Sequence, residues 1–105
     1  MRRGEVWWAN LPPPVGRRPV VLVTRDGVYH ARTSLTAVVT TTRVRDIPVE
    51  VPLGLEDGLP RECVVNADNI VTIRMSELRE RIAQLSPAKT AELEQAIKFA
   101  LALPG

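Results

Sequence analysis

The sequence contains very few of the residues on which metal centres, disulfides and paired-histidine catalysis depend. One cysteine, Cys63, and one histidine, His30, are present among the 105 residues. A lone cysteine cannot form an internal disulfide, and neither residue stands at metal-ligand spacing from another Cys or His. We expect a buried structural thiol at Cys63 and a surface loop position for His30. We therefore predict no metal and no cofactor.

The chain also lacks long apolar runs and the glycine- or serine-centred motifs of common enzyme classes. No stretch approaches the roughly 18 apolar residues of a membrane span, and no signal peptide is visible. We therefore expect a cytoplasmic protein without membrane contact. There is no phosphate-binding glycine loop, and none of the three serines lies in a nucleophile elbow. The length and the 45% hydrophobic content predict one globular domain spanning residues 1–105.

Positive charge is concentrated in the first part of the sequence. Residues 1–45 contain eight arginines and two acidic residues, a balance of +6, whereas residues 46–105 contain six basic and ten acidic residues, a balance of −4. Guanidinium groups match phosphate geometry, so the basic part suits a polyanionic partner such as RNA. An ordinary solvated surface explains the charge alone equally well.

Short β-branched runs bounded by turn residues dominate the chain and predict about seven short strands. The expected strands are 5–11, 19–24, 34–42, 47–51, 62–67, 69–73 and 81–85, the last after a helical turn that begins at Ser76. The valine-rich run 19–24 is typical of a strand buried on both faces, and Pro48 favours an edge position for 47–51.

One amphipathic helix is predicted at the C-terminal end. Ser86 is a typical N-cap, and Pro87 is a typical first helical residue. One apolar stripe then follows at helical spacing, formed by Leu93, Ile97, Ala100 and Leu101. Such a helix closes the end of a small barrel or packs across an open sheet, so the predicted fold class is mainly β with one helix (α+β).

Once metal sites, paired histidines, glycine loops and serine nucleophiles are excluded, the remaining candidates for catalysis are arginines and threonine hydroxyls. This combination suits metal-independent cleavage of RNA. Internal attack by a 2′-OH needs no added nucleophile, but the phosphorane gains negative charge that has to be stabilised. A preorganised guanidinium supplies that stabilisation, and a hydroxyl adds a hydrogen bond. Arginine is a poor general base, so the group that takes the 2′-OH proton stays open.

Three segments give the chain a resemblance to the MazF/PemK toxins, which are ribosome-independent mRNA interferases. They are RGEVWW from Arg3, PPVGRRPVV from Pro13 and LPRECVVNADNI from Leu59. The resemblance extends from Arg3 to about Leu103. It implies an SH3-like small barrel with a C-terminal helix, acting as a homodimer with single-stranded RNA in a groove across the interface.

The resemblance also implies which residues act on RNA. In this family the arginine before the proline of the second strand is catalytic, which here is Arg18. A threonine near the end of the third strand supports the phosphate, which here is Thr41. Thr40 and Thr42 remain alternatives, although alternation would turn both away from a groove that Thr41 faces. The further candidate RNA-binding residues are Arg17, Glu5, Asp68, Asn69 and Arg43.

The implied activity is sequence-specific cleavage of mRNA that leaves a 2′,3′-cyclic phosphate and a 5′-OH. The implied partner is a MazE-like antitoxin whose acidic, disordered tail covers the same groove. The alternatives are a CcdB-like poison of DNA gyrase, which shares the barrel but is not an enzyme, and a barrel that only binds nucleic acid. The Arg18-Pro19 step together with Thr41 favours the ribonuclease.

The sequence leaves open the roles of two tryptophans and one asparagine. Trp7 and Trp8 are neighbours in a predicted strand, so they point to opposite faces and only one of them fits the core. We favour a dimer interface over base stacking for the other tryptophan. Asn69 suits either a substrate contact or the cap of a turn between two strands.

Overall fold

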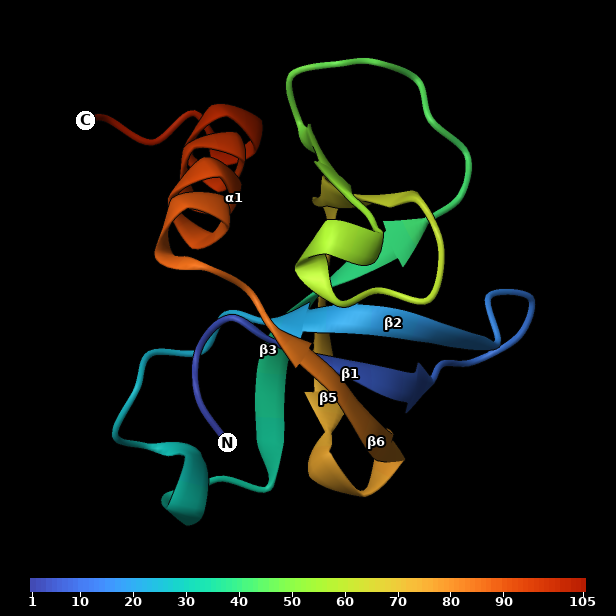
Figure 1. Cartoon of the computed structure of the whole chain (residues 1–105). Helices are drawn as coiled ribbons and strands as arrows, with labels where there is room; N and C mark the ends of the chain where they lie inside the picture. The colour runs from blue at the N-terminus through green and yellow to red at the C-terminus, as the bar shows by residue number, and fades with distance from the viewer.

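The computed structural model describes residues 1–105 and contains one antiparallel sheet of six strands and one C-terminal helix (Figure 1). The strands are β1 (Glu5–Asn10), β2 (Arg17–Leu22), β3 (Ser34–Thr41), β4 (Glu50–Leu53), β5 (Cys63–Arg74) and β6 (Leu78–Gln84). They lie in the order β4-β5-β3-β2-β1-β6, and the sheet curls into a half-barrel. This confirms the mainly β class with a terminal helix.

The strand number differs from the prediction because the two strands expected at 62–67 and 69–73 are one strand, β5. β5 is continuous from Cys63 to Arg74, and its pairing with β3 is interrupted only by a register shift. Val38 pairs with Ile70, whereas Thr40 pairs with Val65. The polar residues between these pairs therefore form a bulge within the strand, which the sequence alone does not distinguish from a turn.

Strand β2 is buried on both faces, as predicted. Val21 packs in a core cluster that extends toward the helix, while Val20 and Leu22 pack in a second cluster on the other face of the sheet. β4 pairs only with β5, which confirms its edge position. The proline inside this edge strand is Pro52 and not Pro48, because pairing begins at Glu50.

The helix α1 (Pro87–Leu101) begins as predicted, since the Ser86 Oγ accepts a hydrogen bond from the Lys89 backbone N at 3.1 Å. The apolar stripe is only partly as predicted. Leu93 and Ala96 are buried against the sheet, whereas Leu101 is 53% exposed. Leu101 lies in the last turn at the edge of the buried arc, just before Ala102 ends the helix in a left-handed conformation. Across the chain, no helix has the length and apolar character needed to cross a membrane.

Candidate functional site

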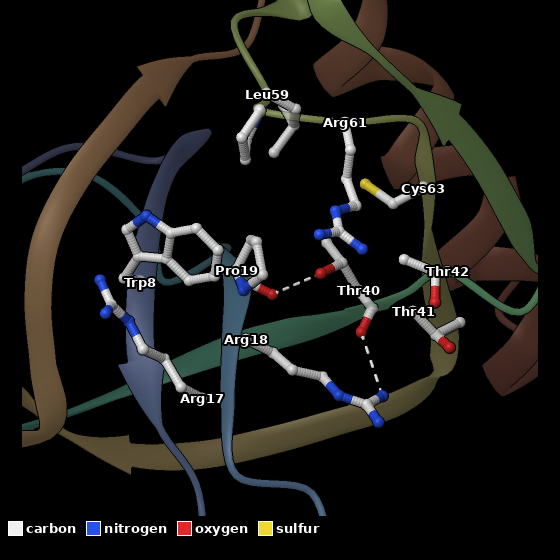
Figure 2. Close-up of a pocket in the computed structure, with 11 residues that line it drawn as sticks. Trp8, Arg17, Arg18, Pro19, Thr40, Thr41, Thr42, Leu59, Arg61 and Cys63 are labelled. Carbon is white, nitrogen blue, oxygen red and sulfur yellow. Dashed lines mark hydrogen bonds between the residues drawn. The ribbon is translucent and has the colours of Figure 1, made fainter.

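The ends of three neighbouring strands and one long connection surround a pocket of about 270 Å³ (Figure 2). β1 provides Trp8, β2 provides residues 17–19, and the end of β3 together with the residue after it provides residues 40–42. The connection from β4 to β5 provides residues 59–61, and Cys63 at the start of β5 completes the lining. The pocket therefore joins segments that are far apart in the sequence.

Arg18 lies in this pocket with its guanidinium group near the end of β3. The side chain is half-buried, and its Nη1 donates a long hydrogen bond of 3.5 Å to the Thr40 carbonyl oxygen. No carboxylate pairs with it. Arg18 is thus a cation at the wall of the pocket with most of its donors free for an anionic ligand.

The three threonines at the end of β3 all line the pocket, which differs from the expected alternation. β3 ends at Thr41, so strand alternation does not constrain Thr42, and Thr40 meets Arg18 through its backbone carbonyl oxygen. Thr40 is buried, and its hydroxyl donates to the Pro19 carbonyl oxygen at 2.7 Å. The Thr41 Oγ1 accepts from the Arg43 backbone N at 3.1 Å, which leaves its hydroxyl proton available to a ligand.

The two tryptophans point to opposite sides of β1, as predicted. Trp7 packs against the second core cluster, and its Nε1 donates to the Glu5 Oε1 at 2.9 Å. Trp8 lies in the pocket, where the Arg17 guanidinium carbon is 4.6 Å from the centre of its ring. Arg17 also approaches Glu80 to 4.0 Å. The tryptophan at the pocket is therefore Trp8, held in a cation–π contact.

Glu5, one of the candidate RNA-binding residues, lies outside the pocket and is only 6% exposed. It accepts the hydrogen bond from Trp7, and Oε2 lies 3.5 Å from the Arg81 Nε. A carboxylate buried between these two donors serves the packing of β1 against β6. We therefore do not include Glu5 in the site.

Three other candidates also lie outside the pocket lining. Asp68 and Asn69 are exposed in the bulge of β5, where the Asp68 backbone N donates to the Asn66 side chain at 2.8 Å. Arg43 is exposed in the loop directly after the pocket threonines. His30 is exposed in a short 3-10 helix and borders a different hollow. The pocket itself gathers only Arg17, Arg18 and Thr41 of the predicted site residues.

The pocket also contains residues that the sequence did not single out for this role, Leu59, Pro60, Arg61 and Cys63. They belong to one of the segments on which the family resemblance depends, and that was the only signal for them. β4 pairs with the first residues of β5, and this pairing brings the connection between them over the ends of β2 and β3. Tertiary pairing is therefore what adds them to the site.

The electrostatic character of the pocket is uniform. Its lining contains three arginines and no acidic residue. Cys63 is buried, as predicted, and burial, followed by the negative charge of Asp57, raises the pKa of its thiol. No group of three or more His, Cys, Asp and Glu side chains is positioned to hold a metal ion. The pocket is suited to an anion.

Comparison with known proteins identifies the family. Residues 2–101 match the sequence profile of the PemK-like, MazF-like toxins of type II toxin-antitoxin systems. The chain belongs to the PemK/MazF toxin family. The probable endoribonuclease MazF2 of Mycobacterium tuberculosis H37Rv is 40% identical over 99 residues, 93% of this chain and 95% of that protein. The endoribonuclease MazF6 of the same strain is 33% identical over 110 residues, 96% of each chain.

Solved structures of MazF toxins have the same fold. The Mycobacterium tuberculosis toxin MazF-mt6 has a TM-score of 0.88 at 33% identity, covering 96% of this chain and 99% of that one. A mycobacterial endoribonuclease in complex with its cognate antitoxin has a TM-score of 0.87 at 32% identity, covering 100% and 98%. The fold alone did not separate a MazF-type enzyme from a CcdB-type gyrase poison, and membership of the MazF family favours the enzyme.

Proposed function

We propose that this MazF-family chain is a sequence-specific, ribosome-independent endoribonuclease that cleaves single-stranded mRNA in the cytoplasm without a metal ion. The observation that carries the proposal is Arg18, a half-buried guanidinium without a carboxylate partner, beside Thr41 in an acid-free pocket. Charge that develops on a scissile phosphate is stabilised most strongly by donors that are already in place and partly shielded from water.

The proposed reaction is an internal transesterification. The 2′-oxygen attacks the adjacent phosphorus, the bond from phosphorus to the 5′-oxygen breaks, and a 2′,3′-cyclic phosphate forms. The proton of the 2′-OH leaves during attack, and the departing 5′-oxygen takes up a proton to become a 5′-OH. Arg18 stabilises the charge on the non-bridging phosphate oxygens, and the free hydroxyl proton of Thr41 donates to one of them.

Proton transfer has to use groups other than a carboxylate or an imidazole of the pocket, because its lining contains neither. A guanidinium keeps its proton at neutral pH, and burial keeps the Cys63 thiol protonated. Arg18 and Thr41 therefore contribute through charge stabilisation and positioning. In this proposal, water that reaches the open pocket takes the 2′-OH proton and supplies the proton that the 5′-oxygen takes up.

The same pocket is proposed to receive the acidic tail of a MazE-like antitoxin. A carboxylate-rich chain offers the anionic oxygens that the three arginines of this acid-free pocket attract. The solved mycobacterial relative in complex with its cognate antitoxin supports this part of the proposal. We also propose a homodimer, in which two copies of the pocket face a common groove.

The test is incubation of purified protein with a long RNA in EDTA, followed by mapping of the 5′ ends and analysis of the 3′ termini. We expect cuts at one short recognition sequence, with cyclic phosphate products. Cleavage that needs added magnesium, or that occurs at every position, contradicts the proposal.

Arg18→Ala provides the decisive variant. We expect the rate constant for cleavage to fall about 100-fold or more, as for removal of a preorganised donor to a developing charge. Arg17→Ala should weaken RNA binding more than it slows cleavage, because Arg17 sits at the rim against Trp8. Arg74→Ala is the matched control, an exposed arginine at the far end of β5 outside the pocket. Equal activity of the Arg18 and Arg74 variants would refute a catalytic role for Arg18.

A further inference from the structure

Arg61 is the one arginine of the pocket without a protein partner. Arg17 contacts Glu80 and Trp8, and Arg18 donates to a backbone carbonyl, whereas the Arg61 guanidinium takes part in no hydrogen bond or ion pair. Figure 2 shows its side chain extending into the pocket toward Thr40, from the side opposite Arg17 and Arg18. Its donors therefore face the pocket while remaining unused.

The backbone that carries Arg61 is held firmly. The turn before it is closed by the Asp57 carboxylate, which accepts from the Gly54 backbone N at 3.0 Å, and by the Leu59 backbone N, which donates to the Gly54 carbonyl oxygen at 3.2 Å. The Leu59 side chain is 2% exposed and belongs to the core. Arg61 thus follows a buried anchor by two residues, so little backbone ordering is needed when its side chain binds a ligand.

Arg18 and Arg61 lie at one acid-free cavity and neither has a carboxylate partner, so an anion placed between them is favoured. We propose that Arg61 binds a phosphate of the substrate strand from the wall opposite Arg18, so that the RNA backbone is held between two guanidinium groups. The inference rests on the proposed function in taking RNA as the substrate. Arg61 positions the strand, while Arg18 acts on the reacting phosphate.

Binding to an uncleavable RNA tests the phosphate contact directly. A mixed-sequence 2′-fluoro RNA keeps the phosphates but lacks the attacking 2′-OH. For Arg61→Ala we expect the slope of log association constant against log KCl concentration to become shallower by about 0.7, the value for one phosphate contact on a single strand. Arg61→Lys should keep the wild-type slope, because it retains the charge. Arg74→Ala, the exposed control outside the pocket, should also keep it.

Cleavage kinetics separate the roles of the two arginines. Arg61→Ala should raise KM about tenfold with kcat nearly unchanged, because a charged hydrogen bond to a phosphate away from the chemistry is made equally in the ground and transition states. Arg18→Ala should instead lower kcat. Arg61 has no partner in the folded protein, so the melting temperature of Arg61→Ala should match that of the wild type.

If Arg61→Ala leaves the slope of log association constant against log KCl concentration unchanged, the inference is wrong. An unchanged slope together with an altered cleavage sequence would indicate that Arg61 contacts a base and not a phosphate. The failure of the proposed function has a different signature. Wild-type protein that binds the 2′-fluoro RNA but cuts no RNA would refute the nuclease activity, while the slopes would still decide whether Arg61 contacts a phosphate.

Discussion

At the scale of single residues, Thr40 and Thr41 are neighbours in one pocket but their hydroxyl groups have different tasks. Thr40 is buried and donates to the Pro19 carbonyl oxygen, which ties the end of β3 to β2. Thr41 is only half-buried and keeps a free hydroxyl proton. The structure thereby distinguishes a structural hydroxyl from one that is open to a ligand, a distinction that three consecutive threonines do not offer in sequence.

Replacement of each threonine by valine tests this difference. Thr40→Val should lower the free energy of unfolding by about 1–2 kcal/mol, because it leaves the partly buried Pro19 carbonyl oxygen without this donor. Thr41→Val should change stability by less than about 0.5 kcal/mol but slow RNA cleavage. Urea unfolding and cleavage assays on the same preparations provide the measurement. A stable Thr40→Val protein together with a fully active Thr41→Val protein would contradict the assignment.

Tyr29 gives a prediction about pH, and it is the one tyrosine of the chain. Burial, followed by the negative charge of Asp26, raises its pKa from 10.0 to about 12. Its hydroxyl also donates to the Thr24 carbonyl oxygen at 2.6 Å. The pKa of Tyr29 is higher in the folded than in the unfolded protein, so the protonated Tyr29 side chain stabilises the fold fully below about pH 10. This stabilisation is lost as the pH rises toward about 12.

We therefore expect the free energy of unfolding to fall over that alkaline range, and the ultraviolet absorbance of tyrosinate to appear later in folded than in unfolded protein. Tyr29→Phe should cost about 1 kcal/mol at neutral pH through loss of the hydrogen bond. The same variant should flatten the alkaline decline, since phenylalanine does not titrate. If the unfolding free energy of Tyr29→Phe falls as steeply with alkaline pH as that of the wild type, groups other than Tyr29 cause the fall.

At the scale of elements, the turn before Arg61 controls where one wall of the pocket lies. Gly58 ends the short 3-10 helix Leu55–Asp57 with a φ of +90°, and a Cβ there would stand 2.8 Å from the Ala83 Cβ of β6. Only glycine meets both constraints at little cost. This turn therefore depends on a glycine for its conformation as well as for its contact with β6.

Gly58→Ala should lower the free energy of unfolding by more than the roughly 1–2 kcal/mol of a left-handed alanine, because the contact with Ala83 adds a steric cost. RNA binding should weaken as well, since the pocket wall follows this turn. Gly27→Ala is the matched control, with a φ of +91° and no atom within 4 Å of the added Cβ. Gly27→Ala should lose only the stability that a left-handed alanine costs, and its RNA binding should be unchanged. An equal loss of unfolding free energy in both variants would contradict the proposed clash between position 58 and Ala83.

Element prediction from the sequence succeeded where local patterns decide the outcome. The valines of β2 indicated burial on both faces, and Ser86-Pro87 indicated the start of α1, because alternation and capping act within a few residues. The division of β5 into two strands was wrong because its polar middle resembles a turn. Only pairing with β3 reveals that this middle is a bulge in a continuous strand.

At the scale of the whole molecule, the charge of the pocket is larger than the net charge of the chain. The net charge is +2, whereas the pocket lining carries three arginines and no acid. Two of these arginines come from the basic first part of the sequence, and Arg61 comes from the acidic remainder. The fold therefore concentrates positive charge that the sequence distributes over two regions of opposite sign.

Salt dependence measures how far RNA binding is confined to this pocket. If the three pocket arginines are the phosphate contacts, log association constant for single-stranded RNA should fall with log KCl concentration with a slope of about −2. A slope more than twice as steep would show that arginines elsewhere on the surface contribute contacts, and the pocket would then be only part of the RNA interface.

The sequence by itself determined the mainly β class, most strand and helix positions, the lone buried thiol and the place of Arg18 at the start of β2, because each of these follows from local patterning or from the family motif. Only the tertiary structure decided that Glu5 is buried against β6, that Asp68 and Asn69 lie outside the pocket, and that Arg61 belongs to it. Those outcomes depend on pairing between strands that are distant in sequence. Long-range pairing sets which side chains share a cavity, and no local pattern records it.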